Sequence, residues 1–168
     1  MKRKQLVDLA FQYCESLAKS NYENFFIGTL FLPRKIIKHF HSIYAYCRMI
    51  DDFGDEFSGE SNHYLDYAEE QLNLCYRGKP DSLSFHALYK TISEFDIPRK
   101  PFQDLIEANR IDQNKKRYNT FSDLLTYCEK SANPVGHLVL YVLGFTEDKC
   151  FELSDLTCTA LQLTNFWQ

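Results

Sequence analysis

The chain has 168 residues, of which 45% are hydrophobic and 25% are charged, and its formal net charge is −4. This composition is typical of a globular domain rather than a disordered chain, and an acidic balance without a basic stripe argues against a nucleic-acid partner. No apolar run reaches the roughly 18 residues of a membrane-spanning helix, and the N-terminus lacks the apolar core of a secretory signal. We expect one cytoplasmic domain over residues 1–168; association with a membrane surface stays open.

Helical spacing recurs from the first residues to the last, and no segment shows the sustained alternation or the tight hairpin turn of a β-sheet. The sequence therefore predicts an all-α fold of roughly seven packed helices. An aromatic stretch at 22–29 separates the first two of them. The expected helical segments are 4–19, 32–56, 62–77, 82–95, 98–117, 121–145 and 147–168.

Cysteine and histidine spacing gives no sign of a zinc site. The six cysteines form no C-x-x-C pair and most fall inside helical patterns, so we expect reduced thiols rather than disulfides. Of the five histidines only His39 and His41 are close in sequence, and they point to different faces of a helix. We expect all five to be structural or surface residues.

The segment 32–56 carries the most informative pattern of the chain. Apolar residues recur at positions 36, 40, 43, 47 and 50, and beside this stripe runs a second line formed by Tyr44, Arg48, Asp51 and Asp55. Residues three or four apart share a helix face, so these two aspartates project together, with Asp52 just beside them. Such carboxylates suit Mg²⁺, which usually also takes substrate phosphates. The alternative is a solvated, acidic helix end.

Arg48 lies one turn before these aspartates, where a planar guanidinium would face the same phosphates. Further along, Pro134 interrupts a helical pattern and is expected to kink it. Ala132 and Gly136 flank this proline and are small, which allows another element to approach closely. They mark either a helix–helix crossing or a kinked wall that opens a channel for a long ligand.

The last helical segment has a polar face. Asp155, Cys158, Gln162 and Asn165 recur at steps of three and four residues, so they share one side of the helix. The two amides are either a satisfied buried pair or polar groups inside a ligand cavity.

These motifs together resemble the squalene/phytoene synthase family, whose members join two isoprenoid diphosphates head to head. The matching stretches, in the family's order, are NYENF, LP, IYAYCRMIDDFGDE, RYxTFSDLLTYCEKSANPVG and TALQLTNFWQ. Within the family, YENF and SANPVG look most like the bacterial hydroxysqualene synthase branch of squalene and hopanoid synthesis.

The resemblance implies an isoprenoid synthase-type helical bundle in which two aspartate-rich motifs hold Mg²⁺ on a prenyl diphosphate. Carried over to this chain, the resemblance implies that Asp51, Asp52 and Asp55 are the catalytic carboxylates. Of these, Asp51 and Asp55 would be the metal ligands. Arg48 and Tyr44 would contact the diphosphate. The residues implied to line the cavity or the prenyl chain are Phe25, Phe26, Tyr127, Gly136, Gln162 and Asn165; Asn24 and Ser131 would lie nearby without a defined role.

One departure from the family pattern affects this expectation. The second D-x-x-x-D motif would begin directly after Gln168, so we expect the N-terminal part of such an enzyme, with C-terminal helices missing. Uncovered apolar faces would then favour oligomers, and the activity of the 168 residues alone stays open.

The resemblance implies Mg²⁺-assisted loss of diphosphate from presqualene diphosphate or farnesyl diphosphate through a carbocation, in squalene, hopanoid or carotenoid biosynthesis. The alternative is a non-catalytic relative, either a helical interaction protein or an inactive fragment.

Overall fold

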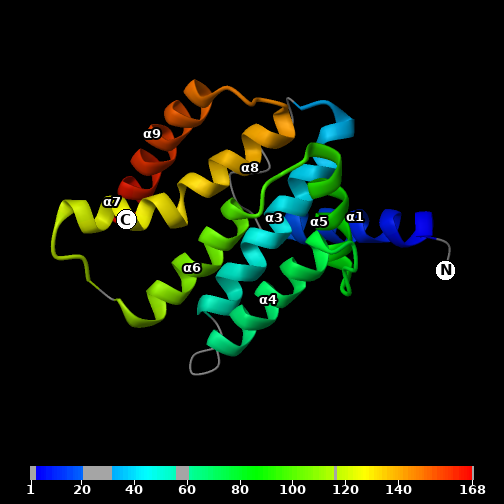
Figure 1. Ribbon diagram of the computed structural model, residues 1–168, viewed down its shortest axis with the longest axis horizontal. Helices are drawn as coiled ribbons and strands as arrows, with labels where there is room; N and C mark the ends of the chain where they lie inside the picture. The colour runs from blue at the N-terminus through cyan, green and yellow to red at the C-terminus, as the bar shows by residue number, and fades with distance from the viewer. Residues whose placement is uncertain (1–2, 21–31, 56–60, 116, 168) are drawn as a thin grey trace.

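The computed structural model describes residues 3–20, 32–55, 61–115 and 117–167. These ranges contain eight α-helices and no strand (Figure 1), so the predicted all-α fold is confirmed. Most boundaries agree with the predicted segments to within two or three residues. The helices are α1 (Arg3–Ser20), α3 (Arg34–Asp55), α4 (Ser61–Tyr76), α5 (Leu83–Phe95), α6 (Lys100–Asn114), α7 (Phe121–Ser131), α8 (Asn133–Leu143) and α9 (Asp148–Asn165).

Helix α3 lies at the centre of the molecule, in contact with α1, α4, α5, α6 and α8 (Figure 1). Of the predicted apolar stripe, Phe40, Ile43 and Ile50 are buried, and the buried face also takes in Tyr46. The hydroxyl of Tyr46 donates a hydrogen bond to the carbonyl oxygen of Phe102 at 2.8 Å. This bond satisfies a buried polar group and joins α3 to α6, the helix that approaches the acidic end of α3.

The segment predicted as one kinked helix is two helices with a break at Ala132. Helix α7 begins with a capping box, in which the Thr120 side chain accepts from the backbone N–H of Asp123 and the Asp123 side chain accepts in return. Pro134 stands in the first turn of α8, where its missing N–H costs no helical hydrogen bond. The proline therefore starts a new helix rather than bending an old one.

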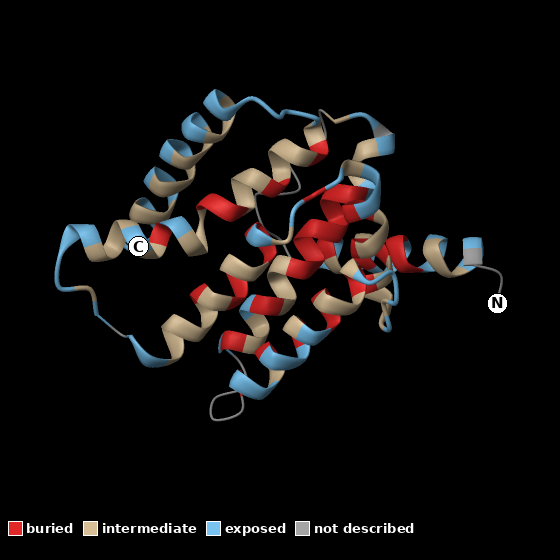
Figure 2. Cartoon of the chain, viewed as in Figure 1, coloured by how far each residue is buried: buried red, intermediate tan, exposed pale blue. Residues whose placement is uncertain are grey.

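Helix α9 lies along one edge of the molecule, against α7 and α8 (Figure 1). None of its residues is buried, and Figure 2 shows it in the colours of exposed and intermediate residues. Three leucines of α9 and the tryptophan that follows are exposed: Leu153, Leu156, Leu161 and Trp167. These side chains give α9 exposed apolar surface, while the expected oligomers stay a prediction.

The six cysteines all lie in the described part of the chain, where each is a free thiol. Burial raises the pKa of Cys14 and of Cys75 to about 12, which makes both thiols poor nucleophiles. Among the described helices, none combines the length and the apolar character needed to cross a bilayer.

Candidate functional site

The acidic end of α3 presents its carboxylates in two different ways. Asp51 and Asp55 are exposed on the last turns of the helix. Asp52 instead forms an ion pair with the Arg48 guanidinium, with 2.7 Å between Nη2 and Oδ1. The two residues are four apart on the helix surface, and each side chain is about one-third exposed. The ion pair holds the Arg48 guanidinium at Asp52, which is next to Asp51 in sequence.

Helix α6 supports this end of α3 from the side. The Nδ2 of Asn109 donates to Oδ1 of Asp51 at 3.4 Å, and the Nε2 of Gln113 donates to the carbonyl oxygen of Gly54 at 2.9 Å. The Ser61 hydroxyl donates to the same carbonyl at 3.3 Å. A Cβ added to Gly54 would overlap the Oδ1 atom of Asn109. Glycine at this position is what lets α6 come so close.

Negative charge accumulates at this helix end. Although Asp51 is exposed, its pKa is raised to about 6, first because neighbouring protein atoms remove part of the water around the carboxylate and then because of the charges of Asp55 and Asp52. The hydrogen bond from Asn109 and the charge of Arg48 oppose this rise without cancelling it. The carboxylates also stand at the C-terminal end of a helix, where the macrodipole is negative.

The donor set fits Mg²⁺ rather than a metal held entirely by protein. In the described residues no three His, Cys, Asp or Glu side chains come together as a ready-made metal site. Mg²⁺ is usually bound by one or two carboxylates together with waters and substrate phosphates. Asp51 and Asp55 supply two exposed carboxylates one helical turn apart, which meets that requirement.

The two predicted tyrosines lie on different helices. Tyr44 is buried on α3, one turn before Arg48. Tyr127 is on α7, and its hydroxyl donates to Oδ2 of Asp112 at 2.5 Å. Burial, followed by the hydrogen bond and charge of Asp112, raises the pKa of Tyr127 far above its ordinary value, so the phenol keeps its proton.

Tyr127 is also part of an aromatic cluster. Its ring centroid lies 5.2 Å from that of Tyr118 and 6.0 Å from that of Phe166. The cluster joins α7 and the residue Tyr118 before it to Phe166, which directly follows α9.

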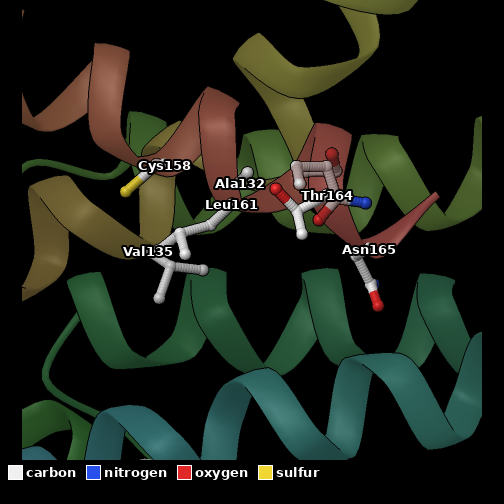
Figure 3. Close-up of a pocket in the computed structure, with 8 residues that line it drawn as sticks. Ala132, Val135, Cys158, Leu161, Thr164 and Asn165 are labelled. Carbon is white, nitrogen blue, oxygen red and sulfur yellow. The ribbon is translucent and has the colours of Figure 1, made fainter. Parts of the chain in front are cut away.

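A groove of about 430 Å³ opens between α9 and the junction of α7 with α8. Figure 3 shows Val135 and Asn165 pointing in the same direction, toward the helices drawn below the groove. Gln162 is half-buried and Asn165 is exposed, so these amides face an open groove and are not a buried pair. The lining residues are Ser131, Ala132, Val135, Cys158, Leu161, Gln162, Thr164 and Asn165.

Gly136 and Asp155 lie at the crossing of α8 with α9 instead. A Cβ on Gly136 would overlap Ser154 Oγ and Cys158 Sγ, so this glycine serves a close helix–helix approach, one of the two sequence interpretations. Asp155 pairs with His137 across the crossing, with 2.6 Å from Oδ1 to Nε2. A role for Gly136 in lining the cavity stays a prediction.

Three of the predicted residues, Asn24, Phe25 and Phe26, lie outside the described residues. Three others were not predicted: Asn109, Asp112 and Gln113 on α6. Their spacing of three and four residues places them on one helix face, but that pattern alone does not reveal that the face meets α3 and α7.

Comparison with known proteins identifies the class and then the family. The helical bundle is of the isoprenoid synthase type: it superposes on the crystal structure of squalene synthase HpnC from Alicyclobacillus acidocaldarius with a TM-score of 0.91 and 47% identity, covering 95% of this chain and 60% of that one. A dehydrosqualene synthase in complex with ligand gives a TM-score of 0.87 at 30% identity, covering 98% and 58%.

The family model for squalene/phytoene synthase matches residues 18–168. Phytoene synthase from Arthrospira platensis is 32% identical over 140 residues, covering 82% of this chain and 45% of that protein. Phytoene synthase 1 of Zea mays is 35% identical over 152 residues, covering 87% and 35%. The chain belongs to the squalene/phytoene synthase family, and it spans less than half the length of these curated relatives.

Proposed function

We propose that this protein acts on prenyl diphosphates in isoprenoid biosynthesis and promotes loss of diphosphate from presqualene diphosphate or farnesyl diphosphate. The observation that carries the proposal is the pair of exposed carboxylates, Asp51 and Asp55, beside an oriented Arg48, in a chain of this family.

The polar residues of α3 would have separate roles toward the metal and toward the leaving group. Asp51 and Asp55 would hold Mg²⁺, which when bound draws negative charge from the diphosphate as the allylic C–O bond breaks. Arg48 stabilises the departing diphosphate electrostatically, and its direction is already set by Asp52. Tyr44 on the same helix contacts the diphosphate.

The remaining residues serve the hydrocarbon part of the substrate. The faces of aromatic rings attract a cation, and Tyr127 stands in an aromatic cluster with its proton retained. Gln162 and Asn165 supply polar groups to the groove, while Phe25 and Phe26 are proposed to wall the prenyl chain. Keeping bulk water from the carbocation is part of the same task.

The squalene branch is the better-supported assignment within the family. This chain is 47% identical in sequence to the squalene synthase HpnC of the crystal structure. Its identity to the phytoene synthases of Arthrospira and Zea is 32% and 35%. We therefore propose a hydroxysqualene synthase-like reaction, in which water captures the cation formed from presqualene diphosphate. The proposed location is the cytoplasm, with contact at a membrane surface.

Product analysis tests this proposal. The protein is incubated with Mg²⁺ and either presqualene diphosphate or farnesyl diphosphate, and products are identified by mass spectrometry. We expect hydroxysqualene from presqualene diphosphate, and its loss in the Asp51→Asn variant. Turnover retained in that variant would remove the site assignment, and no release of diphosphate from either substrate would contradict the function.

A second candidate is a non-catalytic relative that acts as an interaction protein or forms oligomers. The exposed Leu153 and Leu156, three positions apart on α9, favour it, because exposed apolar surface marks sites of association. An interaction protein would bind no prenyl diphosphate analogue in an Mg²⁺-dependent way, which separates the two candidates.

A further inference from the structure

The last turn of α3 has low intrinsic stability as a helix when its contacts with other elements are left aside. It gathers Asp51, Asp52 and Asp55 at the negative end of the macrodipole, where anionic side chains destabilise a helix. The final carbonyl groups have no partner within the helix, and Gly54 is a poorer helix former than alanine. Something outside α3 must hold this turn in place.

Helix α6 supplies two of the outside donors, from amide side chains one turn apart. The Ser61 hydroxyl of α4 also donates to the carbonyl oxygen of Gly54, at 3.3 Å. Gln113 donates to the carbonyl oxygen of Gly54 at 2.9 Å, and Asn109 donates to the carboxylate of Asp51. Gln113 Nε2 also reaches the backbone carbonyl of Asn109 at 3.2 Å. The two amides therefore act on the same turn, one on its backbone and one on its carboxylate.

The neutrality of these donors matters for a cation site. Amides satisfy oxygen acceptors without cancelling the negative charge that would attract a dication, whereas a lysine or arginine would compete with it. The cation on the same stretch of α6, Arg110, is directed elsewhere: it pairs with Asp66 at 2.6 Å and with Glu69 at 2.7 Å, both on α4.

From this geometry we propose that Asn109 and Gln113 are positioning residues, which hold the last turn of α3 so that Asp51 and Asp55 present their carboxylates together to Mg²⁺ and diphosphate. The inference rests on the proposed function and deepens it. Residues that orient metal ligands in this way typically contribute about 10- to 100-fold to metal affinity.

The test measures Mn²⁺ binding in the presence of inorganic pyrophosphate by electron paramagnetic resonance, so that it does not depend on turnover. The variants are Asn109→Leu, which keeps the shape of the side chain without its donors, and Gln113→Leu. Asn114→Leu is the matched control, because Asn114 is exposed on the same helix and, among the described residues, its amide donates to the carbonyl oxygen of Arg110 on that helix and not to α3.

We expect Asn109→Leu and Gln113→Leu each to lose about tenfold or more in Mn²⁺ affinity. The affinity of Asn114→Leu should stay within twofold of that of the unsubstituted chain, and all melting temperatures should be similar. Equal affinity in the unsubstituted chain and both variants would overturn the inference and leave the proposed function standing. No Mn²⁺ binding by the unsubstituted chain would contradict the proposed function and the inference with it.

Hydrogen exchange gives a measurement that needs no ligand. Backbone amides of residues 51–55 should exchange faster in Asn109→Leu and Gln113→Leu than in the control. If Asn109→Leu does not unfold cooperatively, Asn109→Ser is used instead. The serine side chain is too short to donate to Asp51, and it places no apolar group at this position. Unchanged exchange in the folded variants would overturn the inference.

Discussion

The carboxylates at the end of α3 have partners both near and far along the chain. Asp52 pairs with Arg48, four positions before it on the same helix. Asp51 instead accepts a hydrogen bond from Asn109, which is 58 positions away on α6. Helical spacing can reveal the first contact, but no local pattern reveals the second, and the roles of these residues in the site stay predictions.

Gly54→Ala tests the close approach of α6 to α3. The new methyl group would overlap Oδ1 of Asn109, and overpacking of this kind costs about 1–3 kcal/mol. We expect a lower free energy of unfolding in urea. In an Asn109→Ala background the same change should be neutral or stabilising, because the overlapping atoms are gone and alanine is the better helix former. An equal loss in both backgrounds would contradict the account.

His39 is a fully buried histidine whose hydrogen bonds define its tautomer. The Thr91 hydroxyl donates to the carbonyl oxygen of Ala87, so its oxygen accepts from Nδ1–H of His39 at 3.0 Å. Burial lowers the pKa of His39 to about 4, against the opposing charge of Glu94, while Lys38 adds to the lowering. Glu94 Oε2 lies 3.4 Å from Nε2.

This pKa predicts a loss of stability in mild acid. Because the folded state binds fewer protons than the unfolded state, whose histidine has a pKa of about 6.5, the free energy of unfolding should fall as pH falls from about 6.5 toward 4. His39→Gln should reduce this slope in urea unfolding at several pH values. His63→Gln, at an exposed position, should leave it unchanged; an undiminished slope in His39→Gln would refute the assignment.

At the scale of elements, the α7–α8 junction shows where sequence patterns become ambiguous. Pro134 is compatible both with a kink inside one helix and with the first turn of a new one. The structure has the second arrangement, so the predicted kink is wrong. One contact that ties the new helix to α9 is the hydrogen bond from Thr159 Oγ1 to Asn133 Oδ1 at 3.0 Å. That bond joins residues distant in sequence, which local spacing does not reveal.

Gly136→Ala tests the crossing of α8 with α9. The added methyl group would overlap Ser154 Oγ and Cys158 Sγ, so α9 must shift or side chains must rotate, at a cost of about 1–3 kcal/mol. We expect a lower melting temperature, partly restored by Ser154→Gly. A variant as stable as the unsubstituted protein would contradict a tight crossing and would favour the channel interpretation of this segment.

For the whole molecule, the sequence predicted the helical class and the position of most helices, including the central helix within the 32–56 segment. These features depend on local periodicity and end signals, which a single sequence contains. It did not predict how α6 packs against the end of α3 or that the α9 amides face an open groove, because these depend on long-range packing. The family resemblance, confirmed by the match over residues 18–168, supplied the expected roles that periodicity alone did not.

We propose that the acidic end of α3 binds a diphosphate through Mg²⁺, and the function depends on that binding. It can be measured by titration calorimetry with farnesyl thiodiphosphate, a slowly reacting analogue, with and without Mg²⁺. The proteins compared are the unsubstituted protein, Asp51→Asn and Asp55→Asn. We expect binding that requires Mg²⁺ and that either substitution weakens at least tenfold, about 1.4 kcal/mol. Equal binding with and without Mg²⁺, or unchanged binding in both variants, would refute the proposed site.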